Sequence, residues 1–146
     1  MFVPSPGLVG SAALRRALLA DPDVRAVKAE WSRLTVLLVG IGTLEPSPLL
    51  RRGCNTLSAE EQEELRQAGV VGDVCLRYFY SQGDSVASSF DQRVIGIDRG
   101  DISRIPRRVG VAGGVDKAEA IGGAARGGWI NILITDLKVA EALLAS

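Results

Sequence analysis

The chain is organised around residues 105–121, which read IPRRVGVAGGVDKAEAI. Residues 108–112 have the length and composition of a short buried strand. The next two residues, Gly113 and Gly114, predict a turn, because glycine tolerates positive φ and a close backbone approach. We expect a helix from Asp116 onward, with Asp116 as the cap of its first turn. A strand, a Gly-Gly turn and a helix start are the parts with which α/β proteins present backbone N–H groups to an anion.

Lys117 lies on the first turn of this predicted helix, beside Gly113 and Gly114. A phosphate group accepts hydrogen bonds from an ammonium group and from backbone amides together. These residues therefore indicate an anion-binding turn. An ordinary strand-to-helix turn with a solvated lysine stays open as the alternative.

Composition and charge restrict the function. The 146 residues suit one domain, and 47% apolar and 23% charged residues are typical of a globular protein. Because 17 basic residues balance 17 acidic ones, no net field attracts the chain to nucleic acid or to an anionic membrane. No apolar run reaches the ~20 residues of a membrane span, and no secretory signal is recognisable, so we expect a cytoplasmic location.

Histidine is absent from the sequence, which argues against zinc chemistry and against a Ser-His-Asp triad. The two cysteines, Cys54 and Cys75, form no Cys-x-x-Cys pair, and we interpret them as small buried residues. The sequence therefore predicts neither a metal site nor a cofactor.

The order of predicted elements indicates a single α/β unit. Hydrophobic periodicity and capping residues predict helices at 12–20, 23–33, 58–68, 116–125 and 137–145, a helical turn at 99–105, and strands at 34–42, 70–80, 93–97, 108–112 and 129–136. The apolar run 34–42 is typical of a central parallel strand covered on both faces, and ligands bind at the carboxyl end of such strands. Residues 70–97 suggest an antiparallel excursion. Residues 1–4 read as the tail of a strand with no unit before it, so we expect the domain to be incomplete at its N-terminus.

Several motifs occur together in one order along the chain. They include Val39-Gly-Ile-Gly42, Gly72-Asp-Val-Cys75, Arg93-Val-Ile-Gly-Ile97, the Ala-Gly-Gly-x-x-Lys-x-Glu-Ala-Ile run at 112–121, and Asn131-x-Leu-Ile-Thr-Asp136. This combination resembles the C-terminal part of the sugar-binding domain of SorC/DeoR-type bacterial transcriptional regulators. The resemblance covers nearly the whole chain.

The resemblance implies a Rossmann-like three-layer sandwich with a mostly parallel sheet, of the ribose-phosphate isomerase and CoA-transferase type. It also implies that residues 1–146 are the C-terminal part of a domain that senses a phosphorylated sugar. In that family a helix-turn-helix region binds DNA, and we expect both this region and the Gly-Gly-Thr loop of the domain to be absent here. Membrane binding is not expected, whereas self-association into a homo-oligomer is.

The predicted ligand-binding residues are Lys117, Gly113, Gly114, Asp73 and Arg93. Asp73 stands at a strand start, where acidic residues are disfavoured, and could accept hydrogen bonds from sugar hydroxyls or cap a neighbouring turn. Arg93 could bind a phosphate through its guanidinium fork or form an ion pair with Asp73, Asp91 or Asp98.

Three functional hypotheses remain open at this level. The first is an effector-binding domain of a sugar-responsive regulator, and the second is a sugar-phosphate isomerase or deaminase on the same fold. An enzyme of that kind needs a carboxylate that removes a proton from carbon, and either Asp73 or Glu119 could be nominated. No second catalytic group lies at a suitable spacing from either residue, so we expect no enzyme. The third hypothesis is an oligomerisation fragment that binds no ligand.

Asp136 is expected to cap the last helix.

Overall fold

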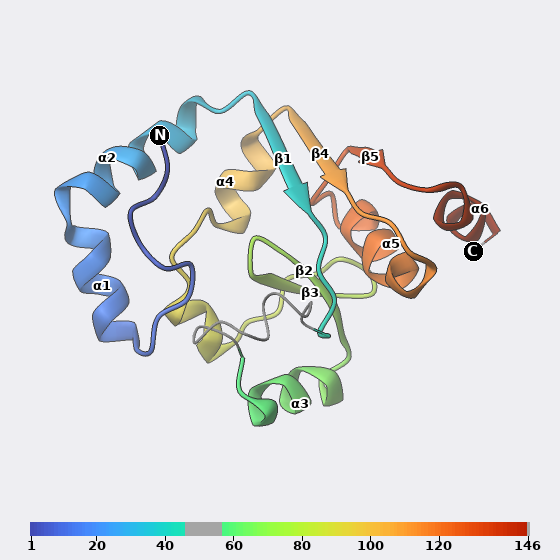
Figure 1. Cartoon of the computed structure of the whole chain (residues 1–146), viewed down its shortest axis with the longest axis horizontal. Coiled ribbons are helices and arrows are strands. Elements are labelled where there is room, and N and C mark those ends of the chain that lie inside the picture. The colour runs from blue at the N-terminus through green and yellow to red at the C-terminus, as the bar shows by residue number, and fades with distance from the viewer. Residues whose placement is uncertain (46–56, 146) are drawn as a thin grey trace.

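A parallel sheet of three strands forms the centre of the computed structural model, which describes residues 1–45 and 57–145 (Figure 1). Its strand order is β1 (Val36–Gly40), β4 (Arg107–Val111) and β5 (Ile132–Ile134). Within one row across the sheet, Val39 pairs with Gly110 and Gly110 pairs with Leu133. The predicted mixed α/β class with a mostly parallel sheet is confirmed.

Two helices and a short 3-10 helix precede this sheet, namely α1 (Ala12–Ala20), α2 (Pro22–Glu30) and η1 (Trp31–Arg33). The hydroxyl of Ser11 caps α1 by accepting the N–H of Leu14, at 3.1 Å. Asp21 separates the two helices, and its carboxylate accepts the N–H of Asp23 at 2.9 Å. Pro22 then occupies the first helical position, where a missing N–H costs nothing.

The helix α3 (Ala59–Gln67) begins with the predicted capping box. The Ser58 hydroxyl accepts the N–H of Glu61 at 3.1 Å, and the Glu61 carboxylate accepts the N–H of Ser58 at 2.9 Å. Gly69 follows the helix with a φ of 82°, which is the left-handed geometry with which many helices end.

The single strand predicted for residues 70–80 is wrong, because this segment folds into a hairpin. Its strands are β2 (Val70–Val74) and β3 (Arg77–Tyr80), and they pair antiparallel. The turn between them consists of Cys75 and Leu76, whose φ angles are 55° and 61°. Neither residue favours positive φ, so the run of β-forming residues concealed the turn.

The strand predicted at residues 93–97 is also not formed. The 3-10 helix η3 (Ser89–Arg93) comes first, and Val94 makes only an isolated bridge to Leu8. Residues 1–4 likewise belong to no strand in the described chain. Apolar β-branched residues form strands where a partner strand runs alongside for several residues. In the described chain the pairing of residues 93–95 with residues 7–9 extends over a single bridge, with hydrogen bonds of 3.0 Å from Val9 to Arg93 and 2.8 Å from Ile95 to Gly7.

Within residues 1–45 and 57–145, the remaining helices are α4 (Arg99–Arg104), η4 (Val115–Lys117), α5 (Ala118–Arg126) and α6 (Leu137–Ala145). The expected cap at Asp116 is wrong, because α5 begins at Ala118. Lys117 holds the cap position and makes no side-chain capping bond there. A turn of 3-10 helix inserted before α5 accounts for the difference.

Two apolar clusters form the core of the described part of the chain. In the larger one, α4 and α5 pack on the inner face of the sheet around fully buried Ile102, Ile121 and Trp129. The smaller cluster lies between the hairpin, α3 and η3, where the rings of Tyr78 and Phe90 meet edge to face at 5.3 Å.

The outer face of the sheet is exposed, so β1 is not the strand covered on both faces that its composition suggested. Exposed side chains on β1, β4 and β5 define what we call the open face: Val36, Leu38, Val111, Ile132 and Ile134. Within residues 1–45 and 57–145, β1 also lies at the edge of the three-stranded sheet. None of the helices in these two ranges is long and apolar enough to cross a membrane.

Candidate functional site

The carboxyl end of β1 is where the structure brings predicted site residues together. Just beyond β1, Gly42 pairs with Asp73 of β2 through two hydrogen bonds between their backbones, of 3.0 and 3.1 Å. A Cβ atom on Gly42 would lie 2.0 Å from Oδ1 of Asp73. The glycine therefore allows the carboxylate to lie directly against the chain at the end of the strand.

Lys117 approaches the same point from η4. Its Nζ atom donates a hydrogen bond to the carbonyl oxygen of Ile41, at 3.4 Å, and its positive charge acts on Asp73. An ammonium group and a carboxylate thus flank the segment Ile41–Gly42. This is the end of a parallel strand at which α/β sheets bind ligands.

Burial of Asp73 raises the pKa of its carboxyl group from 3.8 to about 6. The N–H of Leu76, which donates to Oδ2 at 2.9 Å, and the charge of Lys117 oppose this rise in pKa. Asp73 therefore caps the hairpin turn, which was one of its two predicted roles. The bond from Leu76 is accepted by Oδ2 of Asp73, whereas Oδ1 lies over Gly42.

The Gly-Gly turn (Gly113 and Gly114) has the predicted geometry, with a φ of 96° at Gly114. The backbone N–H of Gly114 already has an acceptor within the protein, because it donates a hydrogen bond to Oδ2 of Asp136 at 2.7 Å. Oδ1 of Asp136 accepts the N–H of Val139 at 3.0 Å, which confirms the predicted cap of α6. A carboxylate of the chain itself thus takes the place that the sequence assigned to an anion.

Other donors lie close to Lys117. The amides of Val115 and Asp116 open the 3-10 helix η4, and the first N–H groups of a helix have no acceptor within it. The N–H of Lys117 itself donates to the carbonyl oxygen of Gly114 at 2.9 Å. The Lys117 ammonium group therefore supplies positive charge at this end of the sheet, while the carboxylate of Asp136 lies against the neighbouring Gly-Gly turn.

Arg93 lies elsewhere and has a partner that the sequence did not suggest. Its guanidinium group forms an ion pair with Glu61 of α3 and lies 5.4 Å from the ring centre of Phe90. The structure thus ties η3 to α3 through Arg93. Glu61 is 32 residues away in sequence, and only the tertiary fold brings it close.

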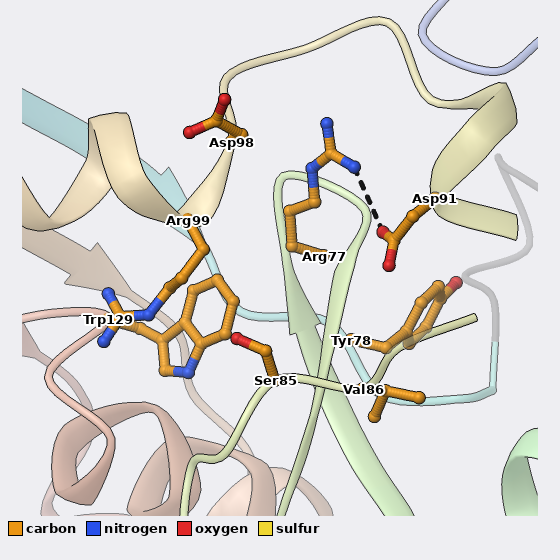
Figure 2. Close-up of a pocket in the computed structure, with 8 residues that line it drawn as sticks. All are labelled: Arg77, Tyr78, Ser85, Val86, Asp91, Asp98, Arg99 and Trp129. Atoms are coloured by element: carbon orange, nitrogen blue, oxygen red, sulfur yellow. Dashed lines mark hydrogen bonds and ion pairs between the residues drawn. The ribbon is translucent and has the colours of Figure 1, made fainter. Parts of the chain in front are cut away.

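A pocket of about 260 Å³ contains none of the predicted site residues (Figure 2). It is lined by Arg77, Tyr78, Ser85, Val86, Asp91, Asp98, Arg99 and Trp129. Its two guanidinium groups are engaged by the protein. Arg77 pairs with Asp91 at 3.0 Å, and Arg99 stacks on Trp129 with 4.4 Å between the guanidinium carbon and the ring centre. These side chains hold the hairpin, α4 and the core together. The sequence suggested Asp91 as an ion-pair partner, but for Arg93 and not for Arg77.

Among the described residues, no group of three or more acidic or cysteine side chains could hold a metal ion. Cys75 is a half-buried free thiol, and Cys54 lies outside the described residues. A cation and a carboxylate at the end of a parallel strand are features of an α/β domain that binds a small molecule.

The comparison with known families identifies this class more closely. Residues 1–145 match the family described as "Putative sugar-binding domain". The chain belongs to this family, and its relatives are transcriptional regulators of the SorC/DeoR type, as the sequence motifs suggested.

Three relatives illustrate the match. The uncharacterized transcriptional regulator YjhU of Escherichia coli is 36% identical over 96% of this chain and 42% of its own length. The crystal structure of the full-length sorbitol operon regulator SorC of Klebsiella pneumoniae has a TM-score of 0.84 and 30% identity, over 95% of this chain and 44% of that one. A DeoR family transcriptional regulator from Listeria monocytogenes has a TM-score of 0.88 and 25% identity, over 98% of this chain and 57% of that one.

The chain therefore spans about half the length of the proteins that it matches. All three relatives are named as regulators, two of them as transcriptional regulators, which points to a regulatory role and away from an enzymatic one.

Proposed function

We propose that this chain contacts the effector of a sugar-responsive transcriptional regulator, and that the effector is a phosphorylated sugar. The observation that carries the proposal is the convergence of Lys117 and Asp73 on the carboxyl end of β1. A sugar phosphate needs both a cation for its phosphate and an acceptor for its hydroxyl groups. These two side chains offer that combination within one site.

Each residue has a specific role in this proposal. Lys117 and the first amides of η4 bind the phosphate, and Asp73 accepts hydrogen bonds from sugar hydroxyls through Oδ1. Gly113 and Gly114 shape the turn that leads into η4. Arg93 would contact a phosphate only after its ion pair with Glu61 opens, so it contributes to binding after the other residues.

The proposed output is control of DNA binding by another part of a longer regulator. The acidic and basic residues of this chain balance, so DNA contact is assigned to a helix-turn-helix region outside it. Effector binding and self-association into a homo-oligomer would both act on that region. Sensing is favoured over catalysis because the matched relatives are named as regulators.

The test compares the affinity of the chain for ribose 5-phosphate and fructose 6-phosphate with its affinity for the two unphosphorylated sugars. Lys117→Met should weaken sugar-phosphate binding by roughly ten- to a hundredfold, because a charged hydrogen bond is worth about 1.5–3 kcal/mol. The matched control is Lys28→Met on α2, which should bind as the parent does. Titration calorimetry measures the affinities, and thermal melting checks that both variants stay folded.

Two results would contradict the proposal. One is equal affinity of Lys117→Met and the parent for either sugar phosphate. The other is a parent chain that binds neither compound. Turnover of these sugar phosphates by the parent would instead support the isomerase hypothesis.

A further inference from the structure

A continuous path of hydrogen bonds joins α6 to the proposed site. The N–H of Val139 donates to Oδ1 of Asp136 at 3.0 Å, and the N–H of Gly114 donates to Oδ2 at 2.7 Å. The carbonyl oxygen of Gly114 then accepts the N–H of Lys117 at 2.9 Å. The path ends where Nζ of Lys117 donates to the carbonyl oxygen of Ile41, at 3.4 Å.

Asp136 fits closely over the Gly-Gly turn. A Cβ atom on Gly113 would lie 2.8 Å from its Oδ2. Gly114 has a φ of 96° and could adopt several other backbone conformations at little cost, so its observed geometry depends on what holds it. The hydrogen bonds from Gly114 and Val139 lower the pKa of the Asp136 carboxyl group, so the group stays ionised near neutral pH.

A cap for α6 alone would need only the bond from Val139. The second bond, from Gly114, crosses to a different element and has no part in capping that helix. It fixes the residue whose carbonyl oxygen holds the N–H of Lys117. The turn and the lysine are thereby oriented together.

We propose that Asp136 is a positioning residue, which holds Gly114 and through it Lys117 in the orientation that binds the effector, without touching the effector itself. This inference rests on the proposed function, because it takes from it that Lys117 binds an effector. The positioning of Lys117 by Asp136 can nevertheless be tested without any ligand.

The ligand-free test uses the three lysines of the chain, Lys28, Lys117 and Lys138, labelled with ¹⁵N. Their backbone amides report on α2, on the proposed site and on the cap of α6, respectively. Asp136→Ala should shift the signals of both Lys138 and Lys117 and should leave that of Lys28 in place. Asp21→Ala, which removes the cap of α2, is the matched control and should shift Lys28 alone.

A second variant separates positioning from the packing of α6. Val139→Ala removes fully buried side-chain atoms of α6 but keeps both carboxylate contacts of Asp136. It should shift Lys138 and leave Lys117 nearly unchanged. An unmoved Lys117 signal in Asp136→Ala would overturn the proposal. So would a shift of Lys117 in Val139→Ala as large as that in Asp136→Ala.

The binding test then uses ribose 5-phosphate. Asp136→Ala should bind it about fivefold more weakly than the parent, which corresponds to the loss of one capping-type bond. Asp136→Asn should lie between the two, because its amide oxygen can replace only one of the two acceptors. Unchanged affinity in Asp136→Ala, with a parent that binds, would refute the positioning role. A parent that fails to bind while the Lys117 signal still responds to Asp136→Ala would refute the proposed function and leave the positioning in place.

Discussion

At the scale of single residues, Asp73 is a carboxylate whose burial opposes its negative charge. The pKa of about 6 lies above the value of 3.8 expected in the unfolded chain. The folded state therefore holds more protons than the unfolded state between these two pH values. The stability associated with this group is complete below about pH 4 and is lost as the pH rises through 6.

Replacement of Asp73 by asparagine should remove this pH dependence. Asn keeps an oxygen that can accept the N–H of Leu76, but it carries no charge to be desolvated. Between pH 4 and pH 7, the free energy of unfolding of Asp73→Asn should rise by about 2 kcal/mol relative to that of the parent. Urea unfolding at a series of pH values measures the difference.

The control for this experiment is Asp23→Asn on the exposed side of α2. Its difference from the parent should vary little over the same pH range. A constant difference between Asp73→Asn and the parent would show that the carboxyl group of Asp73 is ionised equally in the folded and unfolded states. Burial would then not raise the pKa of Asp73.

Several of these residues could be predicted from local sequence, and others could not. Turn geometry at Gly114 and the capping role of Asp136 follow from what the nearby backbone requires, so the sequence predicted both. The ion pair of Arg93 with Glu61 depends on the packing of two distant elements, and sequence spacing contains no information about it. Asp116 failed as a cap because a turn of 3-10 helix shifted the start of α5 past it.

At the scale of elements, the loop after β3 packs tightly against the end of α5. Gly83 has a φ of 86°, and a Cβ atom there would lie 2.2 Å from Cα of Gly127. The carbonyl oxygen of Gly83 also accepts the indole N–H of Trp129 at 2.8 Å. The loop after the hairpin, the end of α5 and the largest fully buried side chain of the core, Trp129, therefore meet at this glycine.

Gly83→Ala should destabilise the fold by at least about 3 kcal/mol, because it combines positive-φ strain with a backbone clash. Gly69→Ala is the matched control. Gly69 also has positive φ, at 82°, but a Cβ atom there meets nothing within 4 Å. That variant should lose only about 1 kcal/mol, from strain alone. Thermal and urea unfolding give both values, and equal losses would show that the loop moves away from α5 without cost.

The hairpin shows why element boundaries were harder to predict than element types. Residues 70–80 contain the β-branched and aromatic residues of a strand, and both halves do become strands. The turn is formed by Cys75 and Leu76, although two-residue hairpin turns favour Asn and Gly. The carboxylate of Asp73 stabilises this turn by accepting the N–H of Leu76, a contact that the pattern of residue types does not reveal.

At the scale of the whole molecule, the sheet has one covered face and one open face. The composition of β1 predicted burial on both faces, because apolar strands of this kind are usually sandwiched between helices. Inside the described chain, only α4, α5 and their neighbours contribute such cover, and they lie on the inner face. Burial depends on what packs against a strand, so sequence composition alone could not establish it.

The open face should make the chain self-associate, because its side chains are apolar and β1 lies at the edge of the sheet within residues 1–45 and 57–145. Leu38 is 69% exposed and Ile134 is 55% exposed, and both lie on this face. Replacing both by lysine should weaken self-association by about tenfold or more per site, since each would otherwise bury an apolar side chain. Stability of the monomer should change little. Sedimentation velocity over a range of concentrations measures the association.

Leu144→Lys tests whether the open face itself, and not added charge in general, controls the association. Leu144 is 90% exposed near the end of α6, a helix that packs against α5 and η4. It should associate as the parent does, because its side chain takes no part in the open face. If Leu144→Lys dissociates as readily as the double variant at Leu38 and Ile134, repulsion between added charges explains the weaker association, and the open face has no special role. A parent that stays monomeric at every concentration would contradict the prediction, because the apolar side chains of the open face would then remain in contact with water.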